Sequence, residues 1–396
     1  MKNVGIIVDN DLNSDIRVCK EVQILKKSGY KIHVICFGFG NKIYKEVEGI
    51  IVQRIKINKS LKDTIYALQS SLPIYEAYWE RKIKKFIRLY SLDILHVHDL
   101  YMSKATFKAK QKTNKDIKII LDLHENYPYA IQSYNWTKGF IRSILTKPKS
   151  WLAKEAPYLK YATRLIVLSQ EFKDELLQKH SFLKEQYIIP FPNVIDFQLF
   201  EKLKSKPIIE KSNKVTLMYF GRIAERRGIF DTLEVLEHCI ENKLPVDLII
   251  IGPIDKADKK SFFSKLSLDH FKSSITYIPW IDISDLTSYM EVCDIFLSPL
   301  KKNKQHESGV ANKIFQYMFG EKPIIVSDCK PQRRLIESFN CGLSYRTNEE
   351  FYHCIEILVN NEKLRIDMGK NGKAQLYKNY NNKTYENILL NLYKEI

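Results

Sequence analysis

The chain has 396 residues, of which 45% are hydrophobic and 28% are charged. This balance excludes a disordered polypeptide and predicts a globular chain of about two or three domains. No stretch approaches the roughly 18–20 apolar residues that a membrane-spanning helix needs, and the opening MKNVGIIVDN predicts a short strand and not a signal peptide. The seven cysteines are odd in number and lack C-x-x-C spacing, which is typical of reduced thiols. We therefore expect a cytoplasmic protein that is soluble or peripheral at the inner face of the cell membrane.

The net charge of +17 is distributed unevenly along the chain. Residues 1–200 carry 33 Lys+Arg against 20 Asp+Glu, whereas residues 201–396 carry 30 against 26. This asymmetry predicts an anionic partner for the first half, namely membrane lipid, nucleic acid or a phosphorylated acceptor. A lysine-rich solvated surface is the alternative.

Short apolar runs alternate with stretches of helical periodicity along the whole chain. The predicted strands cover residues 4–8, 31–37, 50–55, 93–97, 118–123, 164–168, 216–220, 246–251, 274–278, 294–297 and 323–327. Ser14 and Gly29 mark the predicted start and end of the first helix. Because near-continuous apolar strands alternate with helices, the sequence predicts α/β domains with doubly wound parallel sheets.

The segment PFPNVID at residues 190–196 and the polar stretch after it predict a joint between two such sheets. We predict a first domain at residues 1–195, a linker at 196–213, a second domain at 214–378, and a C-terminal helix at 379–396 that crosses back to the first domain. In sheets of this kind ligands bind beyond the carboxyl ends of the strands. Functional residues are therefore expected directly after strands.

The segment ESGVANKIFQYMFGEKPIIVSD at residues 307–328 predicts a polar loop, a helix and a buried strand. Free N–H groups at such a helix start suit a phosphate-bearing ligand, although an ordinary crossover between parallel strands is the alternative. Gly221 and Arg222 follow the first strand of the second half, and Arg227 precedes its first helix. Two arginines suit a diphosphate, because the planar guanidinium forms paired charge-assisted bonds with phosphate oxygens.

These segments resemble the nucleotide-sugar site of the family 4 glycosyltransferases, which have the GT-B fold of two Rossmann-like domains facing across a cleft. The family places an Arg after this glycine and a Lys or Arg before the later one, on the donor diphosphate, and Arg222 and Arg227 match. IIGP at 250–253, YIPW at 277–280 and DIFLSP at 294–299 also resemble family segments. The resemblance implies these donor-binding residues: Gly221, Arg222, Arg227, Gly252, Trp280, Ser308, Gly309, Lys313 and Gln316.

One position departs from the family's pattern. Many members carry two glutamates eight positions apart, of which the second bonds the ribose hydroxyls and the first faces the donor sugar and its phosphate. Here Gln316 stands at the second position, Ser308 stands eight residues before it, and Glu307 comes one residue earlier. Glutamine still accepts and donates hydrogen bonds, whereas a carboxylate accepts more strongly, so we expect donor binding of lower affinity. We assign Glu307 to the donor sugar and its phosphate.

The first half is expected to supply the acceptor side. The D-x-R-V segment at 15–18 resembles the opening of one branch of the family, with Arg17 facing the cleft; the alternative is a helix-dipole partner, Asp15, beside a solvated Arg17. The resemblance places His124 beside the transferred sugar, where it bonds a hydroxyl or supports the developing oxocarbenium charge through its oriented neighbours; a neutral core histidine is the alternative. The expected acceptor-side residues are Asp15, Arg17, His98, Asp99 and Glu125.

Two histidines on one strand raise the question of a metal. His96 and His98 share one face of a strand and, with Asp99 and His124, offer a set of ligands. No further spacing completes a recognised hydrolase motif. The resemblance implies instead that Arg222 and Arg227 stabilise the leaving diphosphate, so we expect neither a metal nor a cofactor. The expected catalytic residues are His124, Glu307, Arg222 and Arg227.

Residues 138–160 interleave large apolar side chains with lysines and an arginine, and Pro148 divides them into two pieces. This pattern suits an interfacial helix among anionic lipid headgroups. The alternative is a helix packed on its own domain with a lysine-rich outer face. The apolar members are Phe140, Ile141, Ile144, Leu145, Trp151 and Leu152.

The sequence thus predicts a retaining glycosyltransferase that moves a sugar from a UDP- or GDP-sugar to a glycan or lipid-linked acceptor, in the biosynthesis of a capsule, O-antigen or exopolysaccharide. Two alternatives stay open. The first is an inactive partner subunit or a nucleotide-sugar epimerase with the same fold. The inactive version is considered because Gln316 replaces the family's second glutamate. The second is a nucleic-acid-binding protein, but no helix-turn-helix, RRM or KH signature accompanies the charge, and we expect no nucleic-acid partner.

Overall fold

The computed structural model describes residues 2–40, 48–203 and 208–396 and contains two compact units. Unit 1 comprises Met1–Pro192 and Tyr385–Ile396, and unit 2 comprises Asn193–Thr384. The sequence placed these boundaries at 195 and 379 and set the linker 196–213 apart, whereas the structure groups that stretch with unit 2. Residues 204–207 of it lie outside the described residues.

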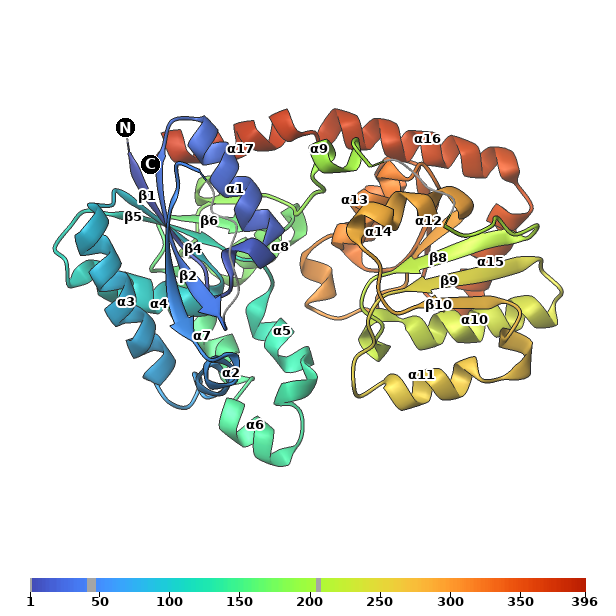
Figure 1. Ribbon diagram of the computed structural model, residues 1–396, viewed down its shortest axis with the longest axis horizontal. Helices are drawn as coiled ribbons and strands as arrows, with labels where there is room; N and C mark the ends of the chain where they lie inside the picture. The colour runs from blue at the N-terminus through green and yellow to red at the C-terminus, as the bar shows by residue number, and fades with distance from the viewer. Residues whose placement is uncertain (1, 41–47, 204–207) are drawn as a thin grey trace. The chain divides into compact units, whose positions relative to one another are not determined.

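Unit 1 contains a seven-stranded parallel sheet in the order β3-β2-β1-β4-β5-β6-β7 (Figure 1). Its strands are β1 (Asn3–Ile7), β2 (Lys31–Phe39), β3 (Ile51–Ile57), β4 (Ile94–His98), β5 (Lys118–Asp122), β6 (Arg164–Val167) and β7 (Ile188–Pro190). Its helices are α1 (Ile16–Lys27), α2 (Lys59–Ala67), α3 (Ile74–Tyr90), α4 (Ser103–Gln111), α5 (Tyr127–Ser133), α6 (Phe140–Thr146), α7 (Ser150–Leu159), α8 (Gln170–Lys179) and, from Tyr385 onward, α17 (Asn382–Lys394).

Unit 2 contains a six-stranded parallel sheet in the order β10-β9-β8-β11-β12-β13. Its strands are β8 (Val215–Phe220), β9 (Val246–Ile251), β10 (Ile275–Ile278), β11 (Ile295–Ser298), β12 (Ile324–Ser327) and β13 (Gly342–Tyr345). Its helices are α9 (Phe197–Phe200), α10 (Ile229–Glu241), α11 (Lys259–Leu266), α12 (Leu286–Val292), α13 (Asn312–Phe319), α14 (Lys330–Ser338), α15 (Asn348–Val359) and α16 (Glu362–Asn379), with the short 3-10 helices η5 (Glu225–Arg227) and η8 (His306–Ser308).

In each sheet the strand order reverses beside the first strand of the unit. β1 lies between β2 and β4, with Ile6 opposite Val34 and His96. β8 lies in the same way between β9 and β11. Because ligands of doubly wound sheets bind outside the carboxyl ends of the strands at such a reversal, the ends of β1, β4, β8 and β11 are where functional side chains are expected.

Apolar side chains fill both faces of each sheet, which is why the strands read as near-continuous apolar runs. In unit 1 the fully buried Trp79 of α3 and Trp151 of α7 belong to the core. In unit 2 the fully buried Tyr219 of β8 belongs to the core. Among the described residues, no helix is long and apolar enough to cross a membrane.

The structure corrects several local predictions. Strands β7 and β13 were not predicted, because β7 has three residues and ends in Pro190, while β13 contains a glycine and a serine. Asp15, and not Ser14, caps α1 by accepting a backbone hydrogen bond within its first turn. Pro148 separates α6 from α7, but Trp151 is buried and its indole N–H donates to Ser70 Oγ at 2.6 Å. The prediction that Trp151 belongs to an interfacial face is therefore wrong.

Candidate functional site

Two glycine loops meet at the carboxyl edge of the sheet in unit 2. Gly221 follows β8 and Gly252 follows β9, with φ angles of +132° and +140°. A Cβ atom on Gly252 would lie 2.0 Å from the carbonyl oxygen of Gly221, so only glycine allows this approach. A Cβ atom on Gly221 would lie 3.8 Å from Nζ of Lys313. The two loops and this lysine therefore lie together beside the end of β8.

Lys313 projects from the first turn of α13 and is buried. Its Nζ lies 3.8 Å from the centroid of the Tyr219 ring, and within the described part of the chain this nitrogen has no hydrogen-bond partner. Burial, together with the charge of Arg227, holds the pKa of Lys313 well below its usual value. Burying an amine without a hydrogen-bond partner is costly. A ligand anion beside Gly221 would supply the partner.

Further basic side chains lie near Lys313. Arg226 and Arg227 belong to η5, and His306 begins η8. Nδ1 of His306 lies 2.7 Å from the carbonyl oxygen of Lys301 and 3.0 Å from the side-chain nitrogen of Asn303; we assign its proton to the shorter contact, which makes the buried Nε2 an acceptor. Burial lowers the pKa of His306 to about 4, and the charges of Arg227, Arg226 and Lys313 act in the same direction. The loop edge thus combines clustered positive charge with a neutral acceptor, which suits a phosphate ester that also carries hydroxyl groups.

Two further residues that were predicted to act on the donor, Arg222 and Glu307, contact other parts of the protein. The side chain of Arg222 is 53% exposed, and its Nη1 pairs with Asp255 Oδ1 at 2.8 Å. Glu307 accepts from the backbone N–H of Lys330 at 3.0 Å, at the start of α14. Both predicted groups are therefore engaged by neighbours from unit 2 in this structure.

Other predicted donor residues differ widely in exposure. Ser308 is buried, and its hydroxyl donates to the carbonyl oxygen of Lys304 at 2.8 Å. Gln316 is half-buried on α13, and Gly309 has an extended backbone. Trp280 follows β10 and is 71% exposed. The site thus combines one buried amine, that of Lys313, with half-buried arginines and an exposed margin.

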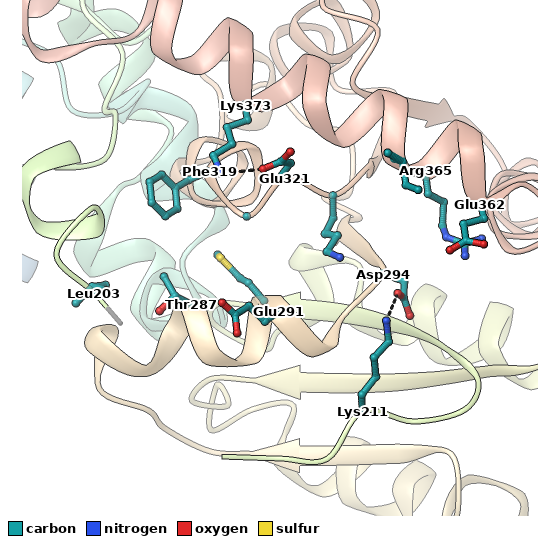
Figure 2. Close-up of a pocket in the computed structure, with 14 residues that line it drawn as sticks. Leu203, Lys211, Thr287, Glu291, Asp294, Phe319, Glu321, Glu362, Arg365 and Lys373 are labelled. Carbon is teal, nitrogen blue, oxygen red and sulfur yellow. Dashed lines mark hydrogen bonds and ion pairs between the residues drawn. The ribbon is translucent and has the colours of Figure 1, made fainter. Parts of the chain in front are cut away.

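A cavity of about 580 Å³ lies at the opposite edge of the same sheet (Figure 2). It adjoins the amino ends of β11 and β12, where Asp294 and Lys322 precede the strands. Four cationic and four anionic side chains line it, and Figure 2 shows the ion pairs Lys211–Asp294 and Lys373–Glu321. Because its charges are matched, the cavity favours no ligand charge, and it is distinct from the predicted donor site.

Polar residues of unit 1 gather where β4 and β5 end. Arg17 of α1 donates two parallel hydrogen bonds to Asp122, from Nε at 2.9 Å and from Nη2 at 2.8 Å. Its Nη1 donates to the carbonyl oxygen of Phe191 at 2.8 Å, and its Nε lies 3.2 Å from Glu21 Oε1. Arg17, Glu21 and Asp122 are all buried. The prediction that Arg17 faces a cleft is therefore wrong, and so is the alternative of a solvated Arg17.

The buried pair sets the charge of its neighbour His124. Burial alone would raise the pKa of Asp122, but Arg17 and His124 hold it well below its usual value. Burial disfavours a charged His124, yet Asp122, whose Oδ2 lies 3.4 Å from Nε2, raises the pKa of His124 to about 9. One-fifth of the His124 side chain is exposed. The structure thus favours a charged, accessible His124 over the alternative of a neutral core histidine.

His96 and His98 are buried beneath His124, and burial lowers the pKa of both. Nδ1 of His98 lies 2.9 Å from Nε2 of His124, and Nδ1 of His96 lies 2.8 Å from the hydroxyl of Tyr393 on α17. The Nε2 atoms of His96 and His98 lie 3.7 and 4.0 Å from Glu21 Oε2. The polar cluster therefore runs from the last helix to His124.

Potential metal-ligand atoms of Glu21, His96, His98 and Asp122 lie within 4.8 Å of one another. The two imidazole rings stack with centroids 4.6 Å apart and planes inclined by 25°. Arg17 also binds both oxygens of Asp122. Arg17 thus occupies Asp122, whereas both carboxylate oxygens of Glu21 and the Nε2 atoms of His96 and His98 have no hydrogen-bond partner among the described residues.

The other predicted acceptor-side residues adjoin this cluster. Asp15 Oδ2 lies 3.8 Å from Nδ1 of His124. Asp99 follows β4 with a φ of +73°, which is strained for a residue with a side chain. Glu125 accepts from the hydroxyl of Tyr134. Backbone strain beside a polar cluster is typical of functional sites.

Sequence reasoning missed several members of both groups, namely Glu21, Asp122 and Tyr393 in unit 1 and Arg226, Asp255 and His306 in unit 2. Glu21 had a local signal, because it follows Arg17 by four residues on one helix. Tyr393 had none, since 297 residues separate it from His96.

Comparisons with known proteins agree with this architecture. The sequence profile of the glycosyl transferases group 1 matches residues 200–375, and that of glycosyltransferase family 4 matches residues 18–199. The capsular polysaccharide biosynthesis glycosyltransferase CapM of Staphylococcus aureus is 22% identical over 326 residues, which cover 74% of this chain and 82% of that protein.

Solved structures share the fold over the full chain. Sucrose-phosphate synthase from Thermosynechococcus elongatus superposes with a TM-score of 0.78 at 13% identity, covering 100% of this chain and 99% of that one. HepE from Anabaena, in complex with UDP-glucose, superposes with a TM-score of 0.72 at 13% identity, covering 100% of both chains. The predicted GT-B fold is confirmed.

Proposed function

We propose that this chain, which belongs to the family 4 glycosyltransferases, transfers a sugar from a UDP- or GDP-sugar to a glycan or lipid-linked acceptor of cell-surface polysaccharide synthesis, with retention at the anomeric carbon. The observation that carries the proposal is Lys313, a buried amine beside the two glycine loops that no described residue hydrogen-bonds. A diphosphate would supply its partner. The donor class is supported by HepE, described in complex with UDP-glucose, and the acceptor class by CapM, a capsular polysaccharide enzyme.

In this proposal the basic groups of unit 2 act on the leaving diphosphate. Negative charge develops there as the bond between sugar and phosphate breaks, and preorganised cations stabilise it. Lys313 and Arg227 contact the phosphates, and Arg222 joins them by leaving Asp255. His306 accepts a donor hydroxyl at Nε2, and Gln316 holds the ribose. Because these side chains supply the charge stabilisation, the reaction requires neither a metal nor a cofactor.

The residues of unit 1 act on the transferred sugar and the acceptor. His124 is charged at neutral pH and therefore donates to a sugar hydroxyl; it does not itself stabilise the positive charge of an oxocarbenium-like sugar. The nearby carboxylates of Asp15 and Asp99 offset that positive charge. Glu307 orients the donor sugar, and Glu125 faces the acceptor.

Thermal unfolding of the full chain with UDP-, GDP-, TDP- and CMP-linked sugars tests the donor site. A ligand that binds only the folded state adds about 2.7 kcal/mol of stability at a hundredfold excess over its Kd. We expect a higher midpoint with UDP- or GDP-sugars, a smaller shift for Arg222→Ala, and an unchanged shift for the control Lys322→Ala in the opposite cavity. If no nucleotide sugar shifts the midpoint, the donor proposal fails. Binding without transfer to any acceptor would favour the inactive partner subunit.

We also propose that α6 attaches the protein to an anionic membrane surface. Phe140 and Ile141 are 83% and 70% exposed, and Ile144 and Leu145 on the same helix are exposed as well. Figure 1 shows α6 at the margin of unit 1, away from its sheet. Contiguous exposed apolar side chains mark interaction surfaces, and the basic residues around them favour anionic lipid.

Replacing Phe140 and Ile141 with serine should weaken binding to phosphatidylglycerol vesicles by at least about tenfold, because each buried apolar side chain contributes about 1.5–3 kcal/mol. Co-sedimentation measures the partition. Phe263→Ser on α11, where the side chain is 42% exposed, is the control and should bind like the wild type. An unchanged partition of the double variant, or a wild type that ignores these vesicles, would refute the attachment.

A further inference from the structure

The last helix, α17, places the hydroxyl group of Tyr393 in the interior of unit 1. Residues from Tyr385 onward belong to unit 1, and Figure 1 shows α17 beside α1. Leu389 and Leu392 are buried apolar contacts, whereas the fully buried Tyr393 brings a hydroxyl to His96. Burying a hydroxyl in an apolar core is unfavourable unless the hydroxyl forms a hydrogen bond.

This hydrogen bond fixes the tautomer of His96. In the described part of the structure the hydroxyl of Tyr393 has one hydrogen-bond partner, Nδ1 of His96, so the hydroxyl donates its proton there. Burial keeps the pKa of Tyr393 well above its usual value, so the phenol stays protonated. Neutral His96 then carries its own proton on Nε2, which lies 3.7 Å from Glu21 Oε2.

His98 is held in the same tautomer from the other side. Nδ1 of His98 lies 2.9 Å from Nε2 of His124 and 3.6 Å from Asp122 Oδ2; because the charged His124 is the donor in the shorter contact, we assign the proton of neutral His98 to Nε2. That nitrogen is 4.0 Å from Glu21 Oε2. The Nε2 atoms of the two stacked rings thus lie nearest one carboxyl, that of Glu21, without hydrogen-bonding it, and Tyr393 lies at one end of the route and His124 at the other.

Each contact along this route constrains the next. Without its hydroxyl partner, Nδ1 of His96 would be a buried, unsatisfied acceptor, and the ring would change tautomer or rotate. Rotation would displace His98, which stacks on His96 at 4.6 Å, and so would alter the hydrogen bond from His98 to His124.

We propose that Tyr393 is a positioning residue for His124 and acts through the fixed tautomer of His96 and the stacked ring of His98. This proposal rests on the proposed function, because His124 matters to catalysis only if it binds the transferred sugar. Among the described residues, the groups that face His124 or act on its charge are Asp15, Arg17 and Glu21 of α1, Asp122 at the end of β5, His96 and His98 of β4, and Asp99 directly after β4.

The test compares wild type, Tyr393→Phe and Tyr30→Phe as full chains. Tyr30 is the control because its ring contacts that of Tyr393 at 5.3 Å. Histidine-selective ¹⁵N NMR reports tautomers and titration midpoints without requiring turnover. We expect Nε2–H resonances for His96 and His98 in the wild type, a changed His96 tautomer in Tyr393→Phe, and a His124 midpoint moved by at least about half a pH unit. Tyr30→Phe should match the wild type.

Kinetics add the second readout. For Tyr393→Phe we expect kcat to fall about tenfold, with KM for the donor within about twofold, because the groups proposed to hold the diphosphate and the ribose belong to unit 2. In a His96→Phe background, adding Tyr393→Phe should have no further effect on kcat. A wild type that binds donor but transfers nothing defeats the proposed function, and the NMR comparison still decides the positioning. An unmoved His124 midpoint together with the wild-type His96 tautomer in Tyr393→Phe would overturn the inference.

Discussion

Replacing Lys313 with methionine is expected to stabilise the ligand-free protein and, in the same variant, to weaken the binding of nucleotide diphosphate sugars. Methionine has a similar length and no charge, so it fills the site over the Tyr219 ring while removing a buried amine that lacks a hydrogen-bond partner among the described residues. Such a group costs about 1–3 kcal/mol. The free energy of unfolding should therefore rise by about that amount.

The affinity of the Lys313→Met variant should change in the opposite direction. A hydrogen bond to a charged group contributes about 1.5–3 kcal/mol, and a factor of ten corresponds to about 1.4 kcal/mol. We expect the Kd for UDP- or GDP-sugars to rise about 10- to 150-fold, as measured by calorimetry. Lys322→Met, in the cavity at the opposite edge of the sheet, should leave the Kd unchanged. A variant that is less stable yet binds donor normally would remove Lys313 from the donor site.

Replacing Arg17 with methionine should destabilise unit 1 by about 3–5 kcal/mol, because it leaves the buried carboxylate of Asp122 without its main counter-charge. Urea unfolding followed by tryptophan fluorescence measures the loss. That signal reports unit 1, since the buried Trp79 and Trp151 both lie there, whereas Trp280 of unit 2 is 71% exposed.

The matched control is Arg222→Met. Arg222 forms an Arg–Asp pair at 2.8 Å, as Arg17 does, but it lies at the surface, where such pairs contribute about 0–1 kcal/mol. A second comparison separates charge from packing: Arg17→Met combined with Asp122→Leu should regain much of the stability, because the apolar pair removes the buried carboxylate of Asp122. Equal losses for Arg17→Met and Arg222→Met would mean that Asp122 finds another partner or water.

The fold was predictable because its signals are local. Each buried strand is a short apolar run, and each crossover helix has its own periodicity, so the α/β class follows from the chain in order. The failures have local causes too. β7 is an edge strand of three residues that ends in Pro190, and β13 begins with Gly342, whose Cβ would lie 1.9 Å from the carbonyl oxygen of Ile324. The close packing of Gly342 against Ile324 requires glycine, and glycine weakens the apolar pattern from which a strand is predicted.

The candidate site was only partly predictable, because charge compensation depends on distant residues. Asp15 lies at the start of a predicted helix and His124 directly follows a predicted strand. The structure brings their side chains within 3.8 Å of each other. The burial of Arg17 depends on its pair with Asp122, which is 105 residues away. No local sequence pattern around either residue predicts this pair. From sequence alone an arginine at the start of a helix is expected to be exposed to solvent. The carboxylate of Asp122 lies beside Arg17 only once the sheet has formed.

The return of α17 to unit 1 also has a consequence for biosynthesis. Unit 2 is one uninterrupted stretch of chain, so it can fold as soon as it leaves the ribosome. Unit 1 must wait, because Tyr385 and Tyr393 belong to its interior but are synthesised after all of unit 2. The nascent first unit therefore lacks the hydroxyl partner of His96 until the end of the chain has been synthesised.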